Sequence, residues 1–193
     1  MTMTDILIQQ LIPLLWLAWC LYWWISARDT KATVRLETVG SRYRHIAPLV
    51  MGALLIGLPA LRLPVLGAYI LPPDWAQYVI GVVLTIAGLG FTVWARRTLG
   101  RNWSGLVTVK ADHELIRTGP YALVRHPIYT GLLLAFVGSA IARDQWRAVL
   151  GLLMIVIGLW RKLKLEERWM TETFGEAYAR YRQEVRALVP FLI

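Results

Sequence analysis

The sequence of 193 residues lacks most of the groups on which metalloenzymes and soluble nucleotide-binding enzymes depend. Its one cysteine, Cys20, lies within an apolar run, so there is neither a disulfide framework nor a cysteine metal cluster. Its three histidines, His45, His113 and His126, are scattered. The GxGxxG, P-loop and HExxH motifs are missing, and so is the serine-hydrolase elbow. We therefore expect no bound metal.

Acidic residues are also scarce, with 12 Asp and Glu against 21 Lys and Arg, and none clusters within an apolar run as a proton relay of a transporter would need. What the chain has in abundance is apolar surface: 57% of its residues are hydrophobic and its mean hydropathy is +0.50. These values are too high for an ordinary soluble domain. Ten tryptophans and eight tyrosines suit a protein that needs many anchors at the membrane interface. We expect an all-α polytopic membrane protein.

The apolar residues form four blocks, and the last block divides into a short hairpin, which gives about five spans. The expected spans are Ile6 to Ile25, Ile46 to about Leu61 with an apolar tail from Val65 to Leu71, Trp75 to Ala95, Ile128 to Ala142, and Trp146 to Trp160. Each hairpin segment has about 15 residues and would cover roughly 22 Å, less than the hydrocarbon core. Snorkelling of Arg143 and Arg147, added helical turns or local thinning would cover the difference.

The basic residues predict the orientation of these spans. Most of them fall in the segments 27–45 and 96–126 and in the tail after Trp160, which a five-span topology places on one side. By the positive-inside rule, the N-terminus is then outside and the C-terminus is cytoplasmic. We attribute the net charge of +9 to two causes, which are the basic residues that set the topology and the attraction of the protein to anionic lipid headgroups. Nucleic-acid binding is the weaker interpretation, because no soluble basic domain exists to carry it.

A polar, turn-rich segment enters the fourth span. Pro120 and Pro127 disfavour helix at the residues before them, and Pro127 suits the first turn of the helix that follows. His126 is expected at the mouth of that helix, beside free backbone N–H groups that favour an anion. The alternative is an ordinary helix-entry loop in which the histidine only caps the helix.

The tail after Trp160 predicts a continued helix that Gly175 ends, with a second helix from near Glu176. For most of this tail we favour an amphipathic helix pair on the inner leaflet, with three arginines touching phosphates. These arginines are Arg180, Arg182 and Arg186. Lys162 and Glu166 are four residues apart and share a helix face, so they form either a surface pair or two ligand contacts.

At these residues the chain resembles the isoprenylcysteine carboxyl methyltransferase family and its bacterial relatives, within the wider phospholipid-methyltransferase-like group. The resemblance covers roughly Gly100 to Pro190. It rests on Gly119-Pro120-Tyr121, on Arg125-His126-Pro127-Ile128-Tyr129-Thr130-Gly131, on Glu166-Glu167, on Phe174-Gly175-Glu176-x-Tyr178-x-x-Tyr181 and on Pro190. It implies one integrated domain in which residues 1–99 supply N-terminal membrane helices and residues 100–193 form the catalytic region. It also implies a bacterial inner-membrane protein, whereas nothing indicates the oligomeric state.

The resemblance implies an enzyme that uses S-adenosylmethionine without a Rossmann domain. The implied cofactor-binding residues are His113, Glu114, Leu115, Ile116, Tyr121, His126, Pro127, Ile128, Tyr129 and Glu166. Where the eukaryotic enzymes place an arginine that faces the substrate carboxylate, this chain has Lys162, with Arg161 adjacent. Lysine is a point charge rather than a bidentate fork, so the acceptor stays open.

The expected reaction is methyl transfer to a lipophilic acceptor that enters sideways from the bilayer. A carboxylate, as in an isoprenylcysteine or another isoprenoid or fatty acid, is already ionised and needs no base. Lys162 or Arg161 would orient it. An amine-bearing lipid would need deprotonation, for which Glu167 or His126 is a candidate. A nicotinamide-dependent membrane reductase and a non-enzymatic scaffold are the other interpretations.

Overall fold

The computed structural model describes residues 3–58, 65–72 and 74–189. The expected end of the second span at Leu61, and Pro190 of the tail motif, lie outside these residues. The chain is 71% helical. The helices are α1 (Met3–Ser26), α2 (Val39–Gly57), α3 (Trp75–Leu99), α4 (Pro127–Arg143), α5 (Trp146–Phe174) and α6 (Glu176–Glu184), with the 3-10 turns η1 (Gly100–Asn102) and η2 (Gly119–Ala122).

One of these elements begins earlier than the sequence predicted, and another extends as predicted. Helix α2 begins at Val39 rather than Ile46, because Thr38 caps it and its hydroxyl accepts a hydrogen bond from the Ser41 N–H at 3.3 Å. Helix α5 continues unbroken past Trp160 to Phe174, so one helix carries both the expected span and the residues that follow it. Gly175, with a φ of 51°, separates α5 from α6 as expected.

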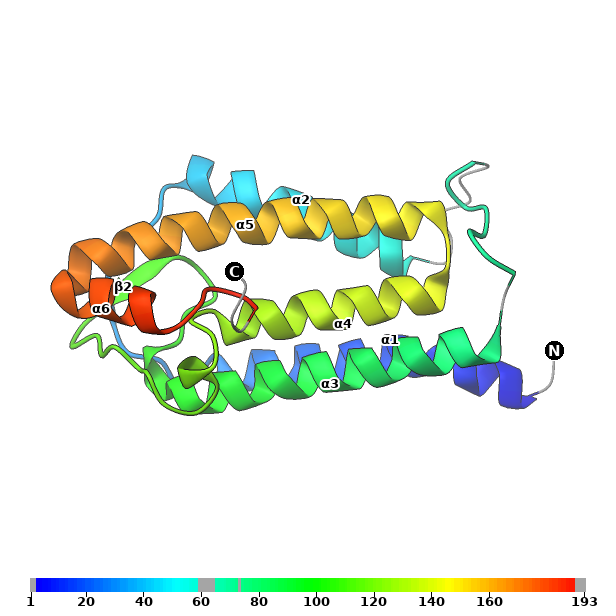
Figure 1. The fold of residues 1–193 in the computed structure, drawn as a ribbon, viewed down its shortest axis with the longest axis horizontal. Helices are drawn as coiled ribbons and strands as arrows, with labels where there is room; N and C mark the ends of the chain where they lie inside the picture. Colours follow the sequence, from blue (N-terminus) through cyan, green and yellow to red (C-terminus); the bar gives the residue numbers. More distant parts are fainter. Residues whose placement is uncertain (1–2, 59–64, 73, 190–193) are drawn as a thin grey trace.

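The expectation of an all-α chain missed one pair of strands. Strands β1 (Thr33–Leu36) and β2 (Thr108–Lys110) pair antiparallel at the end of the molecule that also holds α6 (Figure 1). The two segments are each three or four residues long and far apart in the sequence, so neither carries a readable alternation of its own. Their pairing ties the connection before α2 to the connection before α4.

The helices associate as two close pairs. Helix α3 packs along α4, and α2 packs along α5, with α1 beside α3 (Figure 1). In the first pair, a β-carbon on Gly88 would lie only 2.4 Å from the Ala135 nitrogen, and one on Gly81 would lie 2.6 Å from the Gly138 carbonyl oxygen. Such small residues let membrane helices approach closely. Gly90, on the same helix, faces open space instead.

The second pair uses the same device. A β-carbon on Gly52 of α2 would lie 2.5 Å from the carbonyl oxygen of Gly151 on α5. At the end of this pair, Arg143 Nε donates to the Ile56 carbonyl at 3.0 Å, and Arg147 donates to the Leu58 carbonyl at 2.5 Å. These two arginines therefore satisfy carbonyls at the C-terminus of α2.

The outer surface of the helices is apolar. Large hydrophobic side chains point outward from α1, α2, α3 and α5, among them Leu17, Leu21, Met51, Val83 and Leu153, each at least half exposed. Within the described residues, one helical stretch, Trp75–Asn102, is both long and apolar enough to cross a bilayer. Gln10–Ser26 and Pro127–Arg143 are shorter apolar helical stretches.

Candidate active site

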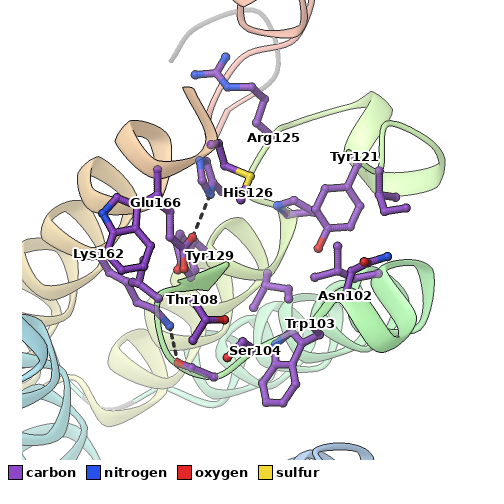
Figure 2. A pocket seen from close by; sticks show the side chains of 18 of the residues that line it. Asn102, Trp103, Ser104, Thr108, Tyr121, Arg125, His126, Tyr129, Lys162 and Glu166 are labelled. Carbon is purple, nitrogen blue, oxygen red and sulfur yellow. Dashed lines mark hydrogen bonds and ion pairs between the residues drawn. The ribbon is translucent and has the colours of Figure 1, made fainter. Parts of the chain in front are cut away.

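A cavity of about 240 Å³ is lined by residues of both helix pairs, of α1, of α6 and of the connections that carry η1, β2 and η2. The residues of the connection before α4 supply one part of its wall, and α5 supplies another. Figure 2 shows Glu166, Tyr129 and Lys162 on one side and Tyr121 and Asn102 on the other. All ten residues that the sequence analysis named for the cofactor line this one cavity, and so does Lys162.

His126 lies between two carboxylates. It precedes Pro127 as the N-cap residue of α4, and its ring stacks on Tyr129 with centroids 5.4 Å apart and planes 4° from parallel. Its Nε2 lies 2.9 Å from Glu167 Oε1, and its Nδ1 lies 3.6 Å from Glu166 Oε2. Burial disfavours the charged ring, but the two carboxylates outweigh burial and raise the pKa of His126. The two carboxylates therefore favour the protonated form of this ring.

Glu166 is the carboxylate that faces the cavity. Its side chain is 24% exposed, and besides His126 it has a hydrogen bond with Tyr129. Burial alone would raise the pKa of this carboxyl group, but His126 and Lys162 together lower it. Glu166 is therefore an ionised carboxylate with a free edge, which suits a ligand that carries positive charge.

Glu167 does not line the cavity but supports it from behind. Its carboxylate accepts hydrogen bonds from Arg125 at 2.9 and 3.2 Å, from the Tyr178 hydroxyl at 2.9 Å, and pairs with Arg182 at 3.1 Å. Burial opposes ionisation here too, but His126, Arg125 and Tyr178 lower the pKa of Glu167 to about 2. At neutral pH this carboxylate holds almost no proton and is fully occupied by its partners.

The two candidate cations for the acceptor lie differently. Lys162 Nζ donates to the Gly105 carbonyl at 2.8 Å and lies 5.5 Å from the centre of the Tyr129 ring, at the cavity wall (Figure 2). Arg161 is exposed, does not line the cavity, and donates to the Arg44 carbonyl at 3.3 Å. The structure therefore brings Lys162, and not Arg161, together with Glu166.

The two backbone N–H groups just before α4 are already used. The N–H of Arg125 donates to the Arg186 carbonyl at 2.8 Å, and the N–H of His126 donates to the Ala187 carbonyl at 3.0 Å. The Thr130 hydroxyl donates to the next carbonyl, Leu188, at 2.7 Å. The expectation that the N–H groups beside His126 would hold an anion is therefore wrong for these two groups, because the C-terminal segment occupies them.

Helix α6 covers the site instead of forming the expected leaflet-bound helix. Its Tyr178 and Tyr181 are each 2% exposed and line the cavity, and the Tyr181 hydroxyl donates to the Tyr121 carbonyl at 2.5 Å. Arg182, expected at lipid phosphates, pairs with Glu167. The tail is thus part of the site and holds the turn that carries Tyr121 and His126.

The connection before β2 supplies contacts that sequence reasoning missed. Asn102 donates to Glu114 Oε2 at 3.1 Å and accepts from the Glu114 N–H at 3.4 Å, and Lys31 lies 3.6 Å from the same carboxylate. The Nδ1 atom of His113 is buried and meets no partner among the described residues. Burial, with Lys31 and Lys110 nearby, lowers the pKa of His113, so this ring is neutral at neutral pH. No sequence motif identifies Asn102, because its partner Glu114 is twelve residues away and the two meet only when the intervening loop folds.

The helical fold, its apolar outer faces and a cavity that joins carboxylate, ammonium and aromatic groups define a membrane-embedded helical protein with a ligand site at one end of its helices. The phospholipid methyltransferase family model matches residues 76–177, and the chain belongs to this family. The match confirms the family resemblance that the motifs predicted. It also begins at α3, earlier than the motifs indicated.

Relatives and a solved structure agree with this assignment. The chain is 30% identical over 120 residues to the protein-S-isoprenylcysteine O-methyltransferase of Saccharomyces cerevisiae, which covers 59% of this chain and 49% of that protein. It is 30% identical over 124 residues to a probable protein-S-isoprenylcysteine O-methyltransferase of Oryza sativa subsp. indica, covering 61% of this chain and 63% of that protein. A solved structure of the eukaryotic intramembrane Ras methyltransferase is similar at 24% sequence identity and a TM-score of 0.57. The match covers 82% of this chain and 55% of the chain in that structure. The chain thus spans between about half and two thirds of the length of these proteins.

Proposed function

We propose that this protein is an integral membrane methyltransferase that uses S-adenosylmethionine and methylates a lipophilic carboxylate, such as an isoprenylcysteine or another isoprenoid or fatty acid. One observation carries the proposal. Residues 113–116, residues 121–129 and Glu166 are separated in the sequence, yet all three groups contribute to one cavity that also receives Lys162. The identity to isoprenylcysteine O-methyltransferases supports the same reaction.

The lining of the cavity suits the methyl donor in charge, hydrogen bonding and aromatic contacts. Glu166 offers an ionised edge for the donor's amino group or ribose hydroxyls, and the unpartnered Nδ1 of His113 offers a further hydrogen-bonding atom. Rings of Tyr121, Tyr129 and Trp103 border the space and suit a positively charged sulfonium. When bound, S-adenosylmethionine supplies an activated methyl group.

Lys162 is the residue that we assign to the acceptor. Its ammonium shares the cavity with Glu166 and donates to the Gly105 carbonyl, which a carboxylate of the acceptor can replace with a stronger, charge-assisted hydrogen bond. A carboxylate is ionised near neutral pH and attacks without a base. The protein therefore contributes position and charge balance, which are large terms in a two-substrate reaction.

The same geometry argues against an amine acceptor, the main alternative raised by the family's name. An amine must lose a proton before it attacks, so the site would need a base. Glu167, with its pKa lowered to about 2, is unsuited to accept one, and the two carboxylates that raise the pKa of His126 favour the form of this ring that already carries the proton. Both groups act here as supports for the site rather than as bases.

The proposal includes a topology in which α1 to α5 cross the bacterial inner membrane. The N-terminus then lies outside, and the cavity end, with α6, faces the cytosol and the anionic lipids that basic residues attract. Lining residues come from both parts of the chain, for example Trp19 and Leu49 from the first 99 residues and Glu166 from the rest. This supports one integrated domain over two separable ones.

The test uses the purified protein in detergent and then in lipid nanodiscs. Binding of S-adenosylmethionine and of NADPH is measured side by side, because NADPH binding alone would indicate a reductase and binding of neither would indicate a scaffold. Membrane lipid extract and an S-farnesylcysteine carboxylate are then incubated with methyl-labelled donor. A carboxyl methyl ester releases its label as methanol in alkali, whereas an N-methylated lipid retains it. Alkali-stable label alone would replace the carboxylate proposal with the amine alternative.

A further inference from the structure

One end of the cavity is entirely apolar. This end lies closer to the middle of the helices than Lys162 and Glu166 do. Its lining consists of one residue from each of four helices: Trp19 from α1, Leu49 from α2, Leu132 from α4 and Leu159 from α5. No described charged side chain is among the lining residues at this level. The cavity therefore has a polar part, which holds Lys162 and Glu166, and an apolar end, which we call the channel.

The channel ends one helical turn further on. There, Phe136 lies four residues beyond Leu132 on α4, and Trp16 lies three residues before Trp19 on α1. Their rings are in contact, with centroids 4.5 Å apart and planes inclined by 30°. Neither residue lines the cavity. On the opposite side at the same level, Ile155 of α5 is fully buried.

Hydrogen bonds hold the tryptophans of this wall in place. Trp16 Nε1 donates to the Ser139 hydroxyl at 2.9 Å, and Trp19 Nε1 donates to the Thr92 hydroxyl at 2.7 Å. Ser139 is 4% exposed and Thr92 is fully buried, so both acceptors are in the packed helix pair rather than at a mobile surface. A fixed indole makes the end of the channel rigid.

We propose that Trp16 and Phe136, one helical turn behind the lining residues Trp19 and Leu132, close the end of a site for the acceptor's hydrocarbon chain and limit the chain length that the enzyme methylates. The inference rests on the proposed function, because it assumes that the acceptor's carboxylate lies at Lys162. From Tyr129, beside Lys162, to Phe136 is seven residues along α4, a rise of roughly 10 Å. A chain that fits this depth gains apolar burial with each carbon, and a longer one meets the wall.

The test compares methyl transfer to S-geranyl, S-farnesyl and S-geranylgeranyl cysteine carboxylates in detergent. Phe136→Ala removes one side of the wall and is expected to raise the ratio of kcat/KM for the longest chain over the shortest by roughly tenfold or more. Leu132→Phe fills the channel one turn earlier and is expected to move the same ratio in the opposite direction. Phe91→Ala, a phenylalanine on α3 that packs beside Trp94 away from the cavity, is the matched control and should leave the ratio unchanged.

A second measurement does not depend on catalysis. A cysteine carboxylate with a benzophenone at the end of its chain is irradiated with the wild-type protein, and the labelled peptide is identified. Labelling near Trp16 or Phe136 without methyl transfer to any acceptor would refute the proposed function but support the chain site. Methyl transfer with an unchanged length ratio in both folded variants, or labelling elsewhere, would overturn the inference about Trp16 and Phe136.

Discussion

Glu167 Oε1 lies 2.9 Å from His126 Nε2, on the side of the ring that faces away from Glu166. Glu167, which is buried outside the cavity, thus orients His126 and favours its protonated form. His126 in turn holds Glu166, the carboxylate that lines the cavity. This order leaves Glu166 free to use its remaining edge on a ligand, much as outer carboxylates orient the histidine ligands of metal sites.

We predict that Glu166→Ala weakens binding of S-adenosylmethionine by roughly two orders of magnitude, because a desolvated charge-assisted contact is lost. His126→Ala should weaken binding too, since it leaves Glu166 without its cationic partner. Equilibrium dialysis with labelled S-adenosylmethionine measures both effects. Glu176→Ala, an exposed carboxylate on α6, is the control. Unchanged affinity in both site variants, with the protein still folded, would remove the donor from this cavity.

Lys162→Met is expected to raise the KM for the carboxylate acceptor by roughly tenfold or more, because the acceptor loses its charged partner. Lys162→Arg should retain most of the activity, since the charge remains and a bidentate contact becomes available. The control is Lys164→Met, because Lys164 is exposed and lies over Trp160. Steady-state kinetics at saturating donor measure the change. An equal loss in the Lys162 and Lys164 variants would contradict a specific role for Lys162.

Stability should depend on pH through Glu167. Because folding lowers its pKa to about 2, the ionised group stabilises the folded protein above the pKa of an unfolded glutamate, about 4.3, and this stabilisation disappears as the pH falls toward 2. The contribution at neutral pH is on the order of 3 kcal/mol. We expect Glu167→Gln to lower the thermal midpoint in detergent at neutral pH and to flatten its decline in acid. Glu166, whose pKa is also lowered, supplies part of the remaining slope. An acid decline as steep in Glu167→Gln as in the wild type would refute the role of Glu167.

The glycines of α3 provide a matched pair. Gly88→Ala places a β-carbon 2.4 Å from the Ala135 nitrogen and should destabilise the protein by about 1–3 kcal/mol through overpacking. Gly90→Ala lies two residues further along the same helix and faces open space, so its higher helix propensity should leave stability equal or improved. Denaturant titration of helical circular dichroism in mixed micelles measures both. Equal stability of the two variants would contradict the close α3–α4 contact.

The sequence was most informative at residues whose own backbone chemistry restricts the local conformation. The prolines at 120 and 127 and the glycine at 175 predicted turns and helix ends from their own backbone chemistry, and the structure has them there. Periodicity could not reveal that α6 turns its tyrosines into the site, because a buried stripe is the same against protein as against lipid. The role of Glu167 was equally hidden, since four of its partners come from α6 and from the turn before α4.

The division of the bundle into two close helix pairs has a consequence for how this protein can change. Glycines fix the spacing within each pair, while the cavity lies between the pairs, where side chains rather than backbones meet. Substitutions at Leu132 or Phe136 are therefore expected to reshape the channel without disturbing the interlocked backbones. Leu49 is different, because it packs directly against Gly158 within the second pair. If the proposed function is correct, acceptor preference can be changed separately from donor binding, and a mutational library at Leu132 and Phe136 is a compact starting point for new lipid methylation reactions.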